Sequence, residues 1–280
     1  MPSPLRPFRL CLVSLLTALS ALCVEAAGAQ GLDLKTVAVC DDVAEWPPFT
    51  YRVRGPGPNG GNAAAREAAP EVVGYSVEVL RRILAPLGIA VRIELLPWVR
   101  CMREVESGQS FQMALNASAS PDRQQRFLLS LPYYETTHTY FYSRRRYPNG
   151  VAVRRVEDVA EFHVCGVHGY NYSAYGLRDE QVDRGALDFS RVIAKLLADR
   201  CEIGIEKLEV VQASRYTGKD LLADPDIAHA PIPGMPKGEF HMLVSRQHPQ
   251  GKALLQVLNS GLKSLRDSGQ LQAIRKSYLP

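Results

Sequence analysis

The feature that most constrains this chain is an alternation of apolar, strand-like runs with helix-like segments that begins near residue 36. Residues 36–40 (TVAVC) and 91–96 are short apolar runs of the kind that form buried strands. Between them, the apolar residues of 79–87 recur every three or four positions, as on one face of a helix, and Ser76 is the expected N-cap of that helix. Strands that alternate with helices predict an α/β fold, in which helices cover a sheet with parallel strands.

The same pattern continues through the rest of the chain. Further strands are expected over residues 111–115, 139–143, 163–167, 202–205 and 239–245, and further helices over residues 99–106, 187–198, 252–267 and 270–278. The repetition predicts two α/β lobes. In such proteins, ligands bind beyond the carboxyl ends of the strands and between domains.

Residues 1–29 have the three parts of a secretory signal peptide. Arg6 and Arg9 precede an apolar run of about 15 residues, which is shorter than the roughly 20 that a membrane-spanning helix needs. Residues 27–29 (AGA) then form a small-x-small cleavage site. Lipidation at Cys23 is not expected, because Leu22 stands where a small residue is required. The mature chain is therefore expected to be an exported, soluble protein of the periplasm.

Composition excludes several classes of function. The chain has 33 Lys+Arg against 29 Asp+Glu, a formal charge of +4, and no stripe of basic residues that could neutralise several phosphates. Nucleic acid is therefore not an expected partner. The hydrophobic content of 46% is that of a globular protein rather than of a disordered one.

The cysteines of the mature chain predict disulfides rather than a metal site. Of the six cysteines, two lie in the signal peptide, which leaves Cys40, Cys101, Cys165 and Cys201. An even number in an exported protein favours disulfides, and four cysteines allow three pairings. Their spacing lacks the CxxC pattern of a zinc site, and no HExxH motif accompanies them. Neither a metal ion nor another cofactor is expected.

Four short motifs stand out in the chain: SPDRQQRFLLSLPYY at residues 120–134, WPPF at 46–49, GYSVE at 74–78 and GVHG at 166–169. Together they resemble the family 3 extracellular solute-binding proteins, the amino-acid-binding components of ABC importers. Residues 120–134 (SPDRQQRFLLSLPYY) are similar to the family's T-P-E-R…F-S-x-P-Y-Y signature. Residues 46–49 (WPPF), 74–78 (GYSVE) and the glycine turn 166–169 (GVHG) follow the family's order, and the similarity spans residues 35–279. The resemblance implies a type II periplasmic-binding fold: two lobes with parallel-dominated sheets, joined by a hinge of two crossovers and closing on a ligand.

On this resemblance, residues 32–138 plus 240–280 would form lobe one, and residues 139–239 would form lobe two. The fold also suggests how the cysteines pair. Cys40 and Cys101 lie near the same ends of neighbouring strands of lobe one, while Cys165 and Cys201 lie near the beginnings of strands of lobe two. A bridge between lobes would lock the hinge. The predicted pairs are therefore Cys40–Cys101 and Cys165–Cys201.

The resemblance also assigns the binding residues. Arg123 matches the arginine that grips the α-carboxylate of the ligand, a task that suits the planar fork of a guanidinium. Ser118 and Asn116 match positions that offer a hydroxyl or backbone group to the same carboxylate. Trp46 and Trp98 match aromatic positions on either side of the ligand. Lobe two is expected to close over the ligand with Tyr170, Asn171 and Tyr172.

One position departs from the family. Lys207 stands where the amino-acid binders carry an aspartate for the ligand's ammonium group, and Glu206 is its neighbour. Alternation along a strand would turn Glu206 to the opposite face. Either a bulge brings Glu206 inward, or the ligand is not an ordinary α-amino acid. A lysine in the cleft would favour a second anionic group.

The expected function is a monomeric periplasmic receptor that captures a small carboxylate-bearing metabolite and presents it to an ABC permease. Two alternatives share the fold. An enzyme resembling cyclohexadienyl dehydratases would use Glu206 as the acid that protonates a leaving hydroxyl. A sensor or accessory receptor would use the same cleft without a transporter of its own.

Overall fold

The computed structural model describes residues 32–54 and 71–279. The predicted signal peptide, residues 1–29, lies outside these ranges. Within them, the strands form sheets of six, five and two strands. The two-stranded sheet pairs β2 (Tyr51–Arg52) with β3 (Val72–Val73). No helix in the described ranges is both long enough and apolar enough to cross a bilayer.

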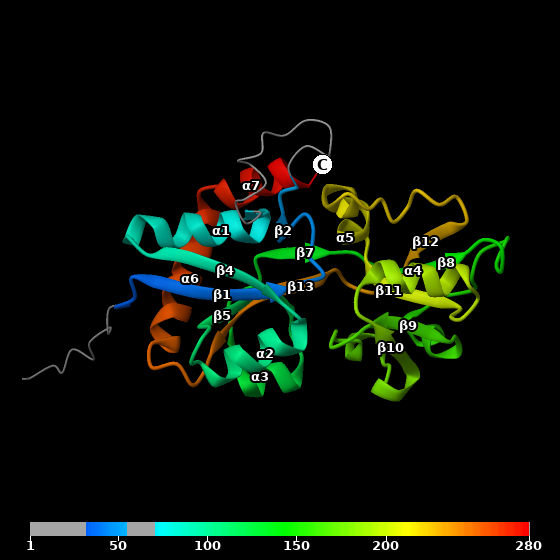
Figure 1. Ribbon diagram of the computed structural model, residues 1–280, viewed down its shortest axis with the longest axis horizontal. Helices are drawn as coiled ribbons and strands as arrows, with labels where there is room; N and C mark the ends of the chain where they lie inside the picture. Colours follow the sequence, from blue (N-terminus) through cyan, green and yellow to red (C-terminus); the bar gives the residue numbers. More distant parts are fainter. Residues whose placement is uncertain (1–31, 55–70, 280) are drawn as a thin grey trace, which may run out of the picture. The chain divides into compact units, whose positions relative to one another are not determined.

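The larger sheet has the strand order β4-β1-β5-β13-β6, with β7 also paired to β13 (Figure 1). Its strands are β1 (Thr36–Asp42), β4 (Ala90–Leu96), β5 (Met113–Ser118), β6 (Phe127–Leu129), β7 (Tyr134–Thr136) and β13 (Gly238–Ser245). The accompanying helices are α1 (Tyr75–Leu84), α2 (Trp98–Ser107), α3 (Pro121–Arg126), α6 (Gly251–Asp267) and α7 (Gln270–Tyr278).

The side chains of β1 alternate between two apolar cores, as the pleat of a strand requires. Val37 and Val39 pack with residues of α1, α6 and α7. Ala38 and Cys40 point to the other face, where they pack with residues of α2. The sheet is therefore covered by helices on both faces, which explains why β1 reads as a continuous apolar run rather than as an alternating one.

The smaller sheet has the order β10-β9-β11-β8-β12 (Figure 1). Its strands are β8 (His138–Ser143), β9 (Val164–Val167), β10 (Val182–Ala186), β11 (Ile203–Lys207) and β12 (Ile227–Pro231). The helix α4 (Phe189–Leu197) packs on one face, and the short helix α5 (Leu208–Gln212) follows β11. The opposite face is covered by the 3₁₀ turns Val156–Glu161 and Ser173–Tyr175.

The chain passes between the two large sheets twice, from β7 to β8 and from β12 to β13. These passages place strands of opposite direction in each sheet. β1 pairs in parallel with β4 and β5, whereas β13 pairs antiparallel with β5, β6 and β7. In the smaller sheet, β9 pairs in parallel with β10 and β11, whereas β8 pairs antiparallel with β11 and β12. The sheets are therefore mixed, and the prediction of parallel-dominated sheets was wrong in this detail.

The first helix begins differently from the prediction. Its N-cap residue is Gly74, at φ 130°, and Ser76 lies inside the helix. A Cβ atom at Gly74 would stand 2.2 Å from the carbonyl oxygen of Phe49, so only glycine fits there. The hydroxyl of Ser76 instead donates a hydrogen bond to Oδ1 of Asn116 at 2.6 Å. Ser76 therefore supports the site described below rather than the helix end.

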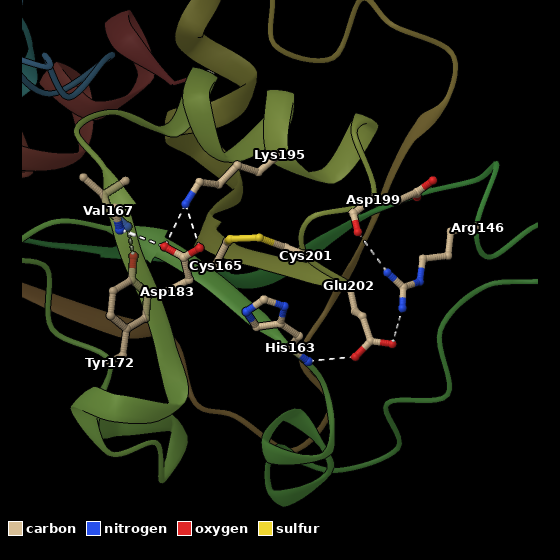
Figure 2. Close-up of a disulfide and its surroundings, with 11 residues drawn as sticks. Arg146, His163, Cys165, Val167, Tyr172, Asp183, Lys195, Asp199, Cys201 and Glu202 are labelled. Carbon is tan, nitrogen blue, oxygen red and sulfur yellow. Dashed lines mark hydrogen bonds and ion pairs between the residues drawn. A yellow bond between two sulfur atoms is a disulfide. The ribbon is translucent and has the colours of Figure 1, made fainter.

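Both predicted disulfides are present in the structure. Cys40–Cys101 links β1 to α2, with the Cα atoms 5.6 Å apart. Cys165–Cys201 links β9 to the second residue before the start of β11, with the Cα atoms 5.9 Å apart (Figure 2). Among the described residues, the single cluster with the makings of a metal site is Cys165, Asp183 and Cys201. Its two sulfurs are bonded to each other and Asp183 is paired with Lys195 (Figure 2), so the cluster has few ligand atoms left to bind a metal ion.

Candidate ligand-binding site

A cavity of about 50 Å³ lies where residues from both large sheets meet. All ten residues that the sequence analysis proposed for the site line it: Trp46, Trp98, Asn116, Ser118, Arg123, Tyr170, Asn171, Tyr172, Glu206 and Lys207. Two aspartates that the sequence analysis did not single out, Asp41 and Asp42, also line it, as do Tyr175 and Phe240. The volume is enough for a few water molecules or a small part of a solute.

Arg123 lies in the first turn of α3, which Ser120 caps by accepting the Arg123 backbone N–H. The side chain is only 7% exposed. Its Nη1 donates to the carbonyl oxygen of Ser118 at 2.9 Å and to the Ser118 hydroxyl at 3.1 Å, and the guanidinium lies over the ring of Trp98. Burial lowers the pKa of Arg123 to about 10, so the group is still a cation at neutral pH.

No acidic oxygen in the described residues forms an ion pair with Arg123, and the hydrogen bonds of its side chain use Nη1 alone. The neighbouring Arg126, on the same helix, is in contrast paired with Glu106 and Asp122. A buried cation without a counter-ion is costly unless a ligand supplies one. Nε and Nη2 of Arg123 therefore have no hydrogen-bond acceptor among the described residues.

Asn116 holds together a polar network under the cavity. Its Oδ1 accepts hydrogen bonds from Ser76, Tyr133 and Tyr134, and its Nδ2 donates to Oδ2 of Asp41 and to the hydroxyl of Thr50, all of them buried. Asn116 also adopts a left-handed backbone conformation, with φ 55°. The hydrogen-bonding groups of the Asn116 side chain are thus all paired within the protein. The residue therefore supports the floor of the cavity and has no free side-chain group for a ligand.

Two acidic residues end β1 at the cavity. The Asp41 carboxylate is buried in the network of Asn116, and burial raises its pKa to about 7. The Asp42 carboxylate accepts the backbone N–H of Ala44 and the hydroxyl of Tyr170, the latter at 2.9 Å, and burial raises its pKa as well. The sequence signal for these residues was their place at the carboxyl end of the first strand, where ligands of α/β sheets bind.

Glu206 and Lys207 both line the cavity, although they are neighbours on β11. The pairing of β11 with β8 is regular through both residues, so no bulge turns Glu206 inward. Instead, the Glu206 carboxylate folds onto the backbone N–H of Lys207, with Oε1 2.8 Å from that nitrogen. At the end of a strand both side chains can reach the cavity. The alternation argument was therefore wrong for this pair.

Burial perturbs both groups: it raises the pKa of Glu206 and lowers the pKa of Lys207. Nζ of Lys207 lies 2.8 Å from Nδ1 of His138 and 2.8 Å from the hydroxyl of Tyr175. Burial and the nearby lysine together lower the pKa of His138 to about 3, which keeps the imidazole neutral. The ammonium thus has neutral hydrogen-bond partners.

The loop after β9 joins the two sides of the cavity. The Tyr170 hydroxyl donates to Asp42, and Nδ2 of Asn171 donates to the Ser118 hydroxyl at 3.3 Å and to the Ala119 carbonyl oxygen at 3.2 Å. The Tyr172 hydroxyl instead accepts the backbone N–H of Val167 at 2.7 Å, within its own side of the molecule (Figure 2). Tyr170 and Asn171 therefore close the cavity from the smaller sheet, and Tyr172 contributes a wall.

The aromatic walls lie on the side of the larger sheet. Trp46 packs edge-on against Tyr170, with ring centroids 5.6 Å apart, and its Nε1 donates to the Tyr134 hydroxyl at 3.1 Å. Trp98 lies against the guanidinium of Arg123. The cavity therefore combines flat apolar surfaces with two buried cations, Arg123 and Lys207, and with buried carboxylates from both sheets.

Two mixed α/β sheets that are joined by two chain passages, with a cavity lined by residues from both, form a periplasmic-binding-protein type II fold. Solved structures of this class are similar to the chain at 13–19% sequence identity, which shows the fold alone. The substrate-binding protein of an amino acid ABC transporter matches with a TM-score of 0.64 and 18% identity, over 87% of this chain and 98% of that one. A histidine kinase sensor domain similar to periplasmic binding proteins matches with a TM-score of 0.66 and 19% identity, over 88% of this chain and 96% of that one.

A third structure is the ancestral amino acid-binding protein AncCDT-1, a precursor of cyclohexadienyl dehydratase. It matches with a TM-score of 0.63 and 13% identity, over 88% of this chain and 96% of that one. A search of the curated proteins finds no match. The model of the bacterial extracellular solute-binding proteins, family 3, matches residues 43–280. The chain belongs to this family.

Proposed function

We propose that this protein is a receptor that captures a small carboxylate-bearing solute, an amino acid or a related anion, between two lobes. The single observation that carries the proposal is Arg123. It is a buried cation with no ion pair among the described residues, and it lies in a cavity to which both large sheets contribute. Its planar guanidinium suits two-point binding of a carboxylate.

The buried acids make an amino acid a better candidate than the sequence suggested. Lys207 replaces the family's aspartate, but Asp42 and Glu206 both line the cavity. A positively charged group of the solute would offset their cost of burial. A zwitterion bound with its carboxylate on Arg123 and its ammonium toward Asp42 and Glu206 is consistent with this arrangement.

We propose that residues 32–138 plus 240–280 move as one lobe and residues 139–239 as the other, with the two chain passages as the hinge. Tyr170 and Asn171 already make hydrogen bonds across the cavity. A solute that contacts both sides would favour the closed arrangement by its higher affinity for it. In this proposal the receptor is a monomer in the periplasm, exported by the signal peptide at residues 1–29, and an ABC permease recognises its closed form.

The experiment is a thermal-unfolding screen of the mature protein with millimolar amino acids, amines, mono- and dicarboxylates and aromatic acids. A solute present at 100 times its dissociation constant adds about 2.7 kcal/mol of stability. The hit should be lost in Arg123→Gln, with affinity reduced at least about 30-fold. The matched control is Arg126→Gln on the same helix, which should bind normally because Arg126 pairs with surface acids. Unaltered binding by Arg123→Gln would contradict the proposal.

A dehydratase-like activity has one observation in its favour. Glu206 is a buried acid whose pKa is raised, so it would hold a proton more readily than a surface glutamate, as a general acid requires. The test is turnover of prephenate or arogenate, which should be absent in Glu206→Gln. A receptor would bind such solutes without converting them. A sensory role uses the same cavity and would be distinguished by the absence of a permease and ATPase gene beside this one.

A further inference from the structure

We propose that the solute is a short dicarboxylate, and that its second carboxylate is bound by the Lys207 ammonium group. The inference rests on the proposed function, in which Arg123 binds the first carboxylate. It assigns a task to Lys207, a buried cation that lines the cavity and has no ion pair among the described residues.

The first argument is the surroundings of the Lys207 ammonium group. The residue is 8% exposed and lines the same cavity as Arg123. Nζ has hydrogen bonds to His138 and Tyr175, at 2.8 Å each. The His138 imidazole is neutral because its pKa is lowered to about 3, and burial keeps the Tyr175 phenol protonated by raising its pKa. These partners orient the ammonium group, but they do not neutralise it.

The second argument is the position of the nearby acids. Over residues 32–54 and 71–279, no carboxylate oxygen forms an ion pair with Nζ of Lys207. Glu206 directs Oε1 to the Lys207 backbone N–H instead. Glu209, which begins the next helix, is held by the backbone N–H and the hydroxyl of Thr137. Asp42, from the other sheet, is bonded to Tyr170. Each acid that faces the lysine is engaged elsewhere.

The third argument is the pairing of two such cations in one cavity. Arg123 follows β5 of the larger sheet and Lys207 ends β11 of the smaller one, so the two cations reach the cavity from opposite sides of the binding site. A solute with one carboxylate could neutralise only one of them. A dicarboxylate could neutralise both and would touch both sheets. Asp42 and Glu206 line the same cavity and would attract an amino group on the chain between the carboxylates, so acidic amino acids fall within the class.

The experiment compares acids with their amides by isothermal titration calorimetry of the mature protein. The matched pairs are L-glutamate with L-glutamine and L-aspartate with L-asparagine, together with glutarate and succinate. We expect wild type to bind at least one acid at least about ten-fold tighter than its amide or its monocarboxylate analogue, because a hydrogen bond to a charged group is worth more than one to a neutral group. Lys207→Met keeps the length of the side chain and removes its charge, and should bring each pair within about two-fold.

The outcomes separate this inference from the proposed function. If an amide or a monocarboxylate binds as tightly as its dicarboxylate, and binding depends on Arg123, the proposed receptor function is supported and the proposed preference for a dicarboxylate is contradicted. The same holds if Lys207→Met binds and keeps the full preference. If no carboxylate binds wild type at all, both fall. Wild type alone gives the preference, so the inference is testable even if the methionine variant does not fold. Lys207→Arg, which keeps the charge, should retain the preference.

Discussion

The two sheets supply charged groups to the cavity in different ways. On the larger sheet, the Asp41 carboxylate belongs to a network in which Asn116, Thr50 and three further hydroxyls are mutually bonded. On the smaller sheet, Glu206 accepts one backbone N–H, and the Lys207 ammonium has only neutral partners. The Asp41 carboxylate of the larger sheet is therefore satisfied by the protein itself, whereas Arg123 on that side and Lys207 on the other are buried cations without an ion pair among the described residues. The polar network should therefore stabilise the larger sheet, while the two cations, one on each side, should respond to a ligand.

The disulfides give the largest expected effect, and they should act on both sides alike. Replacing the Cys40–Cys101 pair by alanines frees a loop of 61 residues, and replacing Cys165–Cys201 frees one of 36. Loop-closure entropy predicts a loss of about 4 kcal/mol in the free energy of unfolding for each pair, with only a small difference between them. Denaturant unfolding of the two double variants measures this. A much larger loss for one pair would break the symmetry between the two sides.

The polar network should make the larger sheet more sensitive to a single substitution. Asn116→Ala leaves the Asp41 carboxylate and several hydroxyls without their partner, so we expect a loss of roughly 3 kcal/mol or more in unfolding free energy. The matched change on the other side is Tyr172→Phe, which removes one buried hydroxyl that accepts a single N–H. It should cost about 1 kcal/mol. Equal losses in the two variants would show that the network contributes no more to the free energy of unfolding than a single buried hydrogen bond.

The hydrogen bonds between the two sides should control closure rather than stability. Tyr170→Phe removes the bond to Asp42 and leaves the packing on Trp46 in place. We expect the ligand-free protein to become more open in small-angle scattering, and solute affinity to fall about three- to ten-fold, the effect of one hydrogen bond of about 1 kcal/mol. Tyr172→Phe, which breaks no bond between the two sides, is the control. Unchanged scattering and affinity would mean that Tyr170 only fills space.

The same contrast explains how much the sequence could predict. Local patterns predicted the strands and helices that form the core, because apolar periodicity reports burial directly. They missed β10 and β12, whose sequences VDRGA and IAHAP have few strand-forming residues and rely on their neighbours in the sheet. The family resemblance led to the cavity residues and the disulfide pairing. Neither pattern nor resemblance indicated His138, because its contact with Lys207 joins residues 69 positions apart.

Asp41 and Asp42 were missed for a related reason. The apolar run ends at Cys40, so the first strand was expected to end there, whereas β1 continues for two acidic residues. A buried carboxylate contradicts the rule that strands in a core are apolar, and only the tertiary partners of Asp41 make its burial tolerable. Positions where local rules fail in this way are expected at functional sites.

The pH dependence of stability receives opposite contributions from Asp41 on the larger sheet and His138 on the smaller one. The pKa of Asp41 is raised to about 7 in the folded protein, from an ordinary value near 3.8. The folded state then binds the extra proton, so this contribution to stability is lost as the pH rises from about 4 to 7. The pKa of His138 is lowered to about 3, from 6.5. There the unfolded state binds the extra proton, so stability rises with pH over the window from 3 to 6.5.

The two variants should separate these slopes between pH 5 and 8. Asp41→Asn, at a site surrounded by Asn116, Asp42 and Tyr133, removes the fall due to Asp41, so its unfolding free energy should rise relative to that of wild type by about 2–3 kcal/mol between pH 5 and 8. His138→Gln, at a site that faces Lys207, Tyr175 and Gly238, removes the rise due to His138, so its unfolding free energy should fall relative to that of wild type by about 2 kcal/mol over the same range. Denaturant unfolding at each pH measures both slopes. Changes of the same sign relative to wild type in the two variants would mean that Asp41 and His138 do not oppose each other, and that burial does not hold Asp41 in its protonated form.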